Sequence, residues 1–228
     1  MPGSLGRRPP SDWKHVDRFP LTIATAPKKP APVVIGVNWY VEFDSPQPDA
    51  QGHQWIARDG RLTTVRGGHC VCLKPRGATD PDAWWDFYDQ GNEGACVGFG
   101  ISRLASQLNR RTYDGFWLYH EAKKVDEWPG EDYDGTSVRA GLDILRKVGH
   151  RVLENGVEAP PALSEGIRAN RWARSVDDVL AVLGYDGLDY VDVLNSWGRG
   201  YPHLTRMPAT VLERLWREDG EVGIVTDR

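Results

Sequence analysis

Short runs of apolar residues, rich in β-branched and aromatic side chains, lie toward both ends of the chain. The first extends from Val33 to Phe43 and is broken by a proline- and glycine-containing stretch, as expected of a buried strand followed by a loop. A second strand is predicted at about Leu62–Leu73. Two further runs, 190–195 and Glu221–Thr226, predict strands near the C-terminus.

The middle of the chain has helical periodicity. Apolar side chains recur three to four residues apart after Cys96, and they predict a helix of about three to four turns that begins at or beside this residue: Val97, Ile101, Leu104 and Leu108. Four more helices are predicted at Phe116–Trp128, Thr136–Val148, Ser175–Leu183 and Ala209–Glu218. Thr136 is the expected N-cap of the second of these four, and Gly149 its stop.

Helices gathered centrally, with strands toward both ends, predict an α+β fold in which a helical part packs against an antiparallel sheet. Residues 1–31 are rich in proline and predict an extended, partly disordered arm before one domain, 32–228. Within that domain, segments 32–73, 90–150 and 170–228 carry the predicted strands and helices. Residues 153–170 show no periodicity, so we expect a surface loop there.

Composition narrows the function classes. The 228 residues include 28 basic and 32 acidic side chains, so the formal charge of −4 offers no positive field for nucleic acid. No apolar run approaches the roughly 18 residues of a membrane span. Three cysteines, an odd number, weigh against a disulfide framework and favour a reducing compartment. We therefore expect a soluble cytoplasmic protein.

Cys96 is the candidate nucleophile. A helix N-terminus favours the thiolate form of a cysteine, and small residues such as Gly94 let backbone amides approach a substrate carbonyl. Gln90 lies six positions upstream and, with the Cys96 amide, is placed to form an oxyanion hole. A lone cysteine is more often a small buried hydrophobe, but these neighbours favour catalysis.

Two further clusters have residue types that would complete such a site. His69 follows two glycines at the beginning of an apolar strand, and Gly68 leaves space beside the imidazole for a substrate. Asn195 ends a strand and could orient a histidine ring, with Trp197 shielding that hydrogen bond from water. Either cluster alone is also compatible with a core histidine or a simple turn.

A zinc site built from His69, Cys70 and Cys72 is disfavoured. On a strand the two cysteines share one face and His69 points away from it. We predict no metal and no cofactor.

Taken together, the three clusters resemble the papain-like cysteine peptidases. That family has a Gln before Gly-x-x-Gly-(Ser/Ala)-Cys at the start of a helix, a Gly-His on a strand and Asn-Ser-Trp-Gly on another; here these correspond to Gln90 with Gly91–Cys96, Gly68-His69 and Asn195–Gly198. The resemblance covers about Val33–Arg228. It implies a peptidase acting on polypeptides, with Cys96 as nucleophile, His69 as general acid/base, Asn195 as orienter and Gln90 as oxyanion donor, and with Gly94, Gly68 and Trp197 in contact with the substrate.

Two departures from the family pattern stand out. Glu93 occupies the position three before the nucleophile, where the family usually has a disulfide-forming cysteine. The family order is Cys, His, Asn, whereas the order here is His69, Cys96, Asn195. We interpret this as a permutation in which segment 32–73 has moved ahead of the Cys helix.

Other interpretations of the base and of the function remain open. His120 and His150 lie between Cys96 and Asn195, but the first is inside an amphipathic helix and the second follows a helix stop. The connection 74–89 would also let the N-terminal segment swap between subunits. The same residues would suit an amidase or isopeptidase, and the fold could instead serve as an inactive structural or binding module.

Overall fold

The structure is a computed structural model that describes residues 29–79, 81, 84, 88–128, 130, 133–185 and 187–226. Of the proline-rich arm predicted at 1–31, only the last three residues lie within this part of the chain. Ala31 donates its backbone N–H to the carbonyl of Val182 (2.8 Å), so the chain enters the fold beside a helix.

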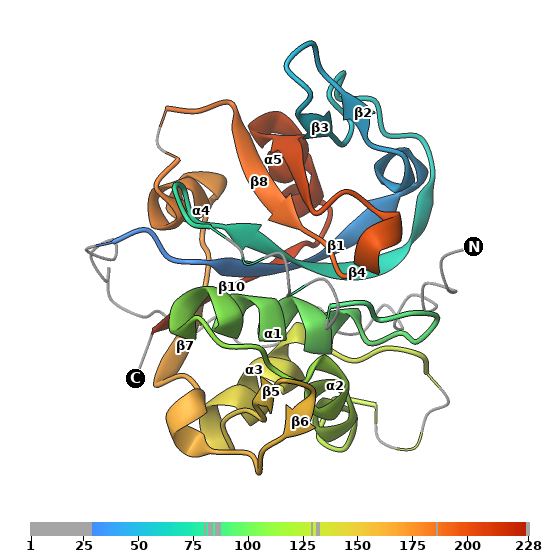
Figure 1. Cartoon of the computed structure of the whole chain (residues 1–228). Coiled ribbons are helices and arrows are strands. Elements are labelled where there is room, and N and C mark those ends of the chain that lie inside the picture. The colour runs from blue at the N-terminus through green and yellow to red at the C-terminus, as the bar shows by residue number, and fades with distance from the viewer. Residues whose placement is uncertain are drawn as a thin grey trace.

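Eight strands of the described chain form one sheet, in the order β2-β3-β9-β8-β4-β1-β10-β7. Neighbouring strands are antiparallel except β3 and β9, which are parallel. β8 and β4 are the two middle strands, and β1 lies beside β4 (Figure 1). The strands are β1 Val33–Tyr40, β2 Gln47–Pro48, β3 Gln54–Trp55, β4 Val65–Lys74, β7 Ala169–Trp172, β8 Tyr190–Leu194, β9 Leu204–Pro208 and β10 Glu221–Thr226.

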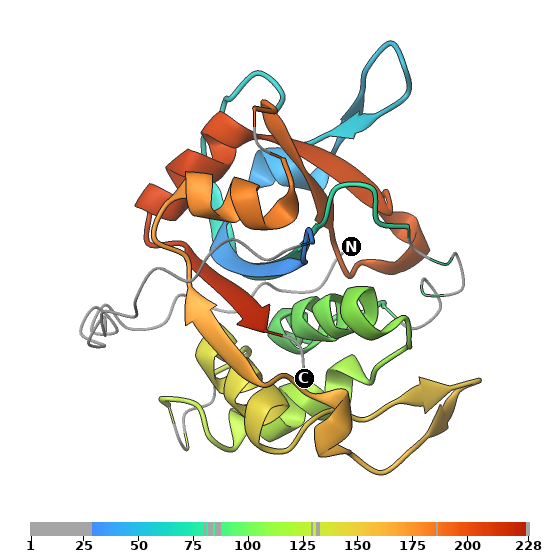
Figure 2. The same ribbon diagram turned by 90° about the vertical axis from the view of Figure 1, so that its left-hand side faces the viewer.

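Helices cover both faces of this sheet. α1, α2 and α3 pack on one side, and α4 and α5 on the other (Figures 1 and 2). The helices are α1 Cys96–Asn109, α2 Gly115–Lys123, α3 Val138–Lys147, α4 Val176–Leu183 and α5 Ala209–Arg217. None of these described helices is long and apolar enough to cross a membrane.

The strand alternation explains why β1 is apolar on both faces. Val33 and Ile35 belong to the core beneath α4 and α5, whereas Val34 belongs to the core beneath α1 and α3. The α+β class and the packing of a helical part against a mainly antiparallel sheet are therefore confirmed.

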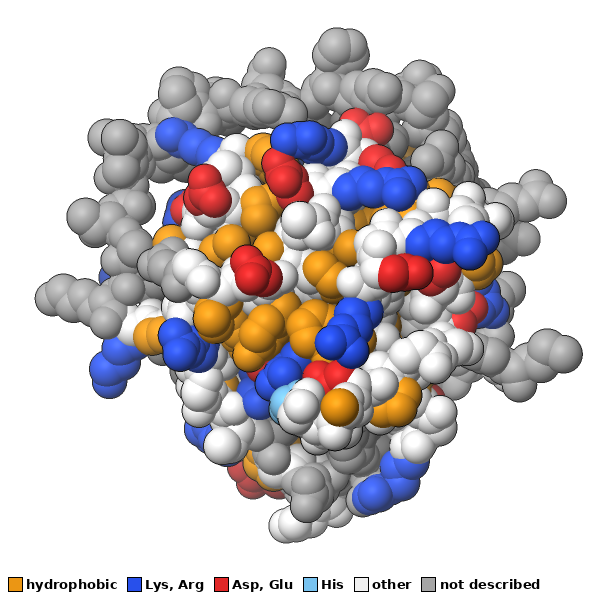
Figure 3. Space-filling view, turned by 90° about the horizontal axis from the view of Figure 1, so that it is seen from above, with side chains coloured by type: hydrophobic (Ala, Val, Ile, Leu, Met, Phe, Trp, Pro, Cys, Tyr) orange, Lys and Arg blue, Asp and Glu red, His pale blue; other side chains and the backbone are white. Residues whose placement is uncertain are grey.

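Opposite charges are interspersed on the outer surface. On the face seen from above, lysine and arginine side chains alternate with acidic ones around exposed apolar side chains (Figure 3). At the β3 edge of the sheet, the guanidinium of Arg206 lies 4.5 Å from the ring centroid of Tyr190, and the Trp55 and Tyr190 rings are 5.6 Å apart. These contacts attach the β2–β3 hairpin to the body of the sheet.

The N-cap prediction for α3 is wrong by one residue. The Ser137 side chain accepts a hydrogen bond from the Ala140 amide and caps the helix, whereas Thr136 donates its hydroxyl to Asp126 (2.9 Å). Both residues have a hydroxyl, but the Thr136 hydroxyl is bonded to Asp126, and the Ser137 hydroxyl caps the helix. Gly149 ends this helix region as predicted, with φ of +92°.

The loop predicted at 153–170 is also wrong. It contains the hairpin β5 Leu153–Glu154 and β6 Val157–Glu158, a 3₁₀ turn at Leu163–Glu165 and the first residues of β7. Asn155 and Gly156 connect β5 to β6 with positive φ at both positions, +53° and +76°. An Asn-Gly pair is the sequence signal for such a hairpin, but strands of two residues are too short to show a period.

His150 anchors the helical layer beneath the sheet. It is fully buried; its Nε2 lies 2.9 Å from the Ser102 hydroxyl of α1, and its Nδ1 accepts the Arg151 amide hydrogen. The Tyr113 ring stacks on the imidazole at 4.7 Å. Burial lowers the pKa of His150 to about 3, so the folded protein holds this ring neutral.

This burial predicts a pH-dependent stability. The folded pKa of His150 lies below the unfolded value of about 6.5, so its stabilising effect is present above that pH and is lost as pH falls below it. The free energy of unfolding should decrease by up to about 1.4 kcal/mol per pH unit for this one group between pH 6 and 5. Urea titrations at pH 7, 6 and 5 measure the slope.

His150→Gln should reduce that slope, and the matched control His120→Gln, on an exposed position of α2, should leave it unchanged. An unaltered slope in His150→Gln would contradict the prediction.

Candidate active site

The predicted histidine strand and asparagine strand are neighbours in the sheet. β4 pairs antiparallel with β8, with Cys72 opposite Leu194 and Lys74 opposite Asp192. Asn195 directly follows the paired residues of β8, and His69 lies three residues before Cys72 on β4. The expected pairing of the two strands is confirmed.

His69 and Asn195 are joined by a short hydrogen bond. The His69 Nε2 lies 2.8 Å from the Asn195 Oδ1, which also accepts the Ser196 amide hydrogen at 2.7 Å. Because that amide oxygen can only accept, the Nε2 carries the proton, and the neutral ring presents Nδ1 as a base. Nδ1 is buried and has no partner among the described residues.

Two tryptophans enclose this hydrogen bond. The Trp39 ring meets the His69 ring edge-on at 4.6 Å, and the Trp197 ring lies 5.2 Å from it. Burial lowers the pKa of His69 to about 4, and the bond to Asn195 only partly opposes this shift. Trp197 therefore lies where the sequence analysis expected a shield, and Trp39 supplies a second one.

The loop that carries Gln90 is hydrogen-bonded to the loop that follows β8. The backbone N–H of Gln90 donates to the Ser196 carbonyl (3.0 Å), and the backbone N–H of Gly198 donates to the Tyr88 carbonyl (3.4 Å). Gly198 has φ of +58°, and a side chain there would meet Asp89. The Asn-Ser-Trp-Gly stretch is thus held against the Gln90 loop.

Gln90 is buried, with one side-chain donor already used. Its Nε2 donates to the Glu93 carbonyl at 3.0 Å. An amide nitrogen has two hydrogens, so the second is available to a substrate oxygen. The carbonyl of Glu93 fixes the orientation of this donor.

Cys96 is the first residue of α1, as predicted, and is partly buried. The backbone amide of Cys70, the residue after His69, lies near the Cys96 thiol and favours its charged form. Burial raises the pKa of the Cys96 thiol to about 11, while the amides of Cys70, Val97 and Cys96 itself act in the opposite direction. The Asp134 carboxylate adds to the increase.

The other predicted contact residues differ in accessibility. Gly68 is exposed, and a side chain built there would meet open space. Gly94 is buried, and its amide donates to the Asp134 carboxylate (3.0 Å), so that N–H is not available to a substrate. No sequence signal pointed to Asp134, because an Asp-Gly pair before a helix is an ordinary turn.

The alternative histidines lie in other environments. His150 has both ring nitrogens occupied inside the helical layer. His120 lies on α2 with more than half of its side chain exposed, and its Nε2 is 3.5 Å from the Glu93 carboxylate. Of the three candidate bases, His69 alone is bonded to Asn195.

The described cysteines and acidic residues of the site do not form a metal-binding cluster. Among the residues that the structure describes, no group of three or more His, Cys, Asp or Glu side chains is placed to hold a metal ion. Cys70 and Cys72 both face the core beneath α1. All three cysteines are free thiols.

Comparisons of this chain with protein-family models, with curated proteins and with solved structures found no match.

Proposed function

We propose that this protein is a cysteine peptidase of papain-like architecture, which hydrolyses peptide bonds with Cys96, His69, Asn195 and Gln90. The observation that carries the proposal is the 2.8 Å hydrogen bond between His69 and Asn195, which leaves the second ring nitrogen as a buried base. The backbone amide of Cys70, next to that histidine in the sequence, is among the groups that favour the thiolate of Cys96.

The chemistry follows the roles of these groups. The Cys96 sulfur adds to the peptide carbonyl carbon, and the thiol proton passes to the His69 Nδ1. The carbon–nitrogen bond then breaks as His69 returns this proton to the leaving amine, which leaves a thioester. Water gives a proton to His69 and adds to the thioester; the carbon–sulfur bond breaks, and the sulfur regains a proton.

Negative charge develops on the carbonyl oxygen in both additions. The free Gln90 N–H and the Cys96 amide, one of the unpaired donors at the start of α1, are the groups that would stabilise it. Asn195 fixes the tautomer and orientation of the imidazole. The two tryptophans exclude water from the His69–Asn195 bond.

The hydrogen bonds of α4 support the permuted order. The amide of Ala31, just before β1, donates to Val182, and the amide of Arg76, just after β4, donates to Leu183. Both ends of the relocated segment therefore lie at the C-terminus of one helix. In the family order the chain would leave α4, run through β1 and β4, and continue to β8. The permuted chain can therefore place the same elements in the same positions and differ only in the loops that connect them.

The three free thiols support a protein that functions without disulfides. Such a protein suits a reducing compartment, and we propose the cytoplasm.

Cys96 should be the one thiol modified by a peptidyl fluoromethyl ketone. Cys70 and Cys72 are buried between α1 and the sheet, whereas Cys96 retains accessible surface. Mass spectrometry of the digested protein maps the adduct. Cys96→Ser should abolish labelling while the circular dichroism spectrum stays unchanged, and the matched control Cys72→Ala should still be labelled.

A folded protein that gives no adduct would favour a non-enzymatic binding module. An adduct on Cys70 would overturn the assignment of the nucleophile.

Asn195→Ala should lower kcat by about 10- to 100-fold with little change in KM, because the variant loses the acceptor that orients His69. Asn195→Asp keeps an acceptor at this position and adds a negative charge, so it should recover part of the rate and raise the pKa of His69. Steady-state kinetics with a fluorogenic peptide test both variants. Equal kcat in wild type and Asn195→Ala would show that Asn195 only shapes the turn.

The acid limb of the pH–rate profile should lie well below the usual histidine value. His69 must be unprotonated to accept the thiol proton, and burial lowers its pKa to about 4, so activity should persist below pH 6 and be lost as pH falls through about 4. kcat/KM measured from pH 3.5 to 8, with the fold checked at each pH by circular dichroism, tests this expectation. A midpoint at 6.5 or higher in folded protein would contradict it.

A further inference from the structure

One peptide group in the loop before α1 is hydrogen-bonded at both of its ends. The carbonyl of Glu93 accepts the side-chain amide of Gln90 at 3.0 Å. The N–H of Gly94, which belongs to the same peptide group, donates to the Asp134 carboxylate at 3.0 Å. A peptide group is planar, so a bond at the N–H also fixes the direction of the carbonyl. The position of Asp134 is thereby linked to the orientation of Gln90.

The side chain of Gln90 depends on this peptide group for its orientation. Its Nε2 is held by the Glu93 carbonyl, whereas its Oε1 is buried and has no hydrogen-bond partner among the described residues. Turning the side-chain amide over would place two oxygens against each other. A rotation of the 93–94 peptide plane would therefore turn or release the proposed oxyanion donor.

Gly94 fits closely against Asp134. Gly94 is buried, so its N–H would be left without a partner if the carboxylate were absent. A Cβ built on Gly94 would lie 2.5 Å from the Asp134 Oδ1 and 2.9 Å from the backbone carbonyl carbon of the same residue. The lack of a side chain at Gly94 is what lets the carboxylate reach the peptide group.

The segment that carries Asp134 is itself fixed in front of α3. One residue before it, the carbonyl of Tyr133 accepts a hydrogen bond from the ammonium group of Lys123 on α2. Two residues after it, the Thr136 hydroxyl donates to Asp126 at 2.9 Å. Asp134 is therefore presented to the Gly94 loop from a segment that is attached on both sides to α2 and the turn after it.

A carboxylate in this place has two effects on the site. Hydrogen bonds to an ionised acceptor are stronger than neutral ones, and they polarise the peptide group so that its carbonyl is a better acceptor for Gln90. Burial raises the pKa of the Cys96 thiol, and the charge of Asp134 adds to this increase. An asparagine would supply the same acceptor atom without the charge, so substitution separates the two effects.

We propose that Asp134 is a positioning residue that holds the 93–94 peptide group and, through it, directs the Gln90 side chain toward the oxyanion of the substrate. This inference rests on the proposed peptidase function. In the papain-like pattern a disulfide-forming cysteine usually occupies position 93. Here the Asp134 carboxylate secures this loop without a disulfide.

The test compares two reactions of Cys96. Hydrolysis of a fluorogenic peptide amide develops charge on the carbonyl oxygen and uses Gln90, whereas iodoacetamide alkylates the sulfur with loss of iodide and develops no such charge. Asp134→Ala should lower kcat/KM about 10-fold, less than the loss of a whole oxyanion donor. Its alkylation rate should equal or exceed that of wild type, because a negative charge near the sulfur is removed.

A double-mutant cycle assigns the effect to Gln90. In the Gln90→Ala background, Asp134→Ala should cause no further loss of kcat/KM, because the side chain that Asp134 orients is gone. Asp134→Asn keeps an acceptor oxygen in the same place and should recover most of the rate that Asp134→Ala loses.

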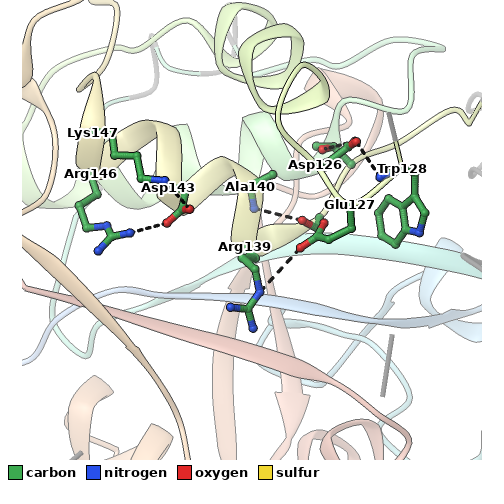
Figure 4. Close-up of polar contacts among 10 residues, drawn as sticks. Asp126, Glu127, Trp128, Arg139, Ala140, Asp143, Arg146 and Lys147 are labelled. Atoms are coloured by element: carbon green, nitrogen blue, oxygen red, sulfur yellow. Dashed lines mark hydrogen bonds and ion pairs between the residues drawn. The ribbon is translucent and has the colours of Figure 1, made fainter. Parts of the chain in front are cut away.

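Asp143→Ala is the matched control. It makes the same change in net charge as Asp134→Ala, but on the solvent side of α3, where Asp143 pairs with Arg146 and Lys147 (Figure 4). It should hydrolyse the peptide at the wild-type rate. Thermal unfolding of every variant verifies its folding.

The outcomes separate this proposal from the proposed function. The role of Asp134 is overturned, and the peptidase function stands, if Asp134→Ala keeps the wild-type kcat/KM, if it loses the same factor with and without Gln90, or if alkylation slows as much as hydrolysis. If folded wild-type protein neither hydrolyses peptides nor reacts with a peptidyl fluoromethyl ketone, the peptidase function fails and the role of Asp134 fails with it.

Discussion

The close packing of α1 on β4 is the contact on which the rest of the candidate site depends. Gly100 of α1 lies directly over Cys70, and a Cβ at Gly100 would be 2.9 Å from the Cys70 sulfur. Because the helix approaches so closely, the Cys96 thiol at its start lies near enough to the Cys70 backbone amide for that amide to favour the thiolate. A larger residue at Gly100 would push the helix outward and move Cys96 away from the histidine strand.

The same packing removes water from both members of the proposed dyad. Burial raises the pKa of Cys96 and lowers that of His69, so the free protein holds both a neutral thiol and a neutral imidazole. A buried ion pair would lose the solvation of both charges, which the few amides around the sulfur only partly replace. Under the proposed mechanism, the thiol would therefore transfer its proton to His69 only when a substrate carbonyl is present to accept the electron pair of the sulfur.

Periodic segments and the pairing of the histidine strand with the asparagine strand were predicted well, and other contacts between distant segments were not. The helix at Cys96 and the strand at 221–226 begin where the apolar pattern indicated, because each buries a regular face. β9 and the hairpin at Asn155 are too short or too mixed to show a period. For the site, the residue types at positions 69, 90, 96 and 195 were visible in the sequence, but Asp134 was not, since only loop packing brings it to the Gly94 amide.

The pairing of β1 with β10 has a consequence for how the molecule forms. β1 is made early, yet one of its two neighbours in the sheet is the last strand, and the His69–Asn195 bond spans 126 residues. Contacts of such large sequence separation carry a high loop-closure entropy and form late in folding. A chain still emerging from the ribosome therefore holds its histidine strand with one edge unpaired. The proposed catalytic centre can assemble only after Asn195 has been synthesised, 126 residues after His69.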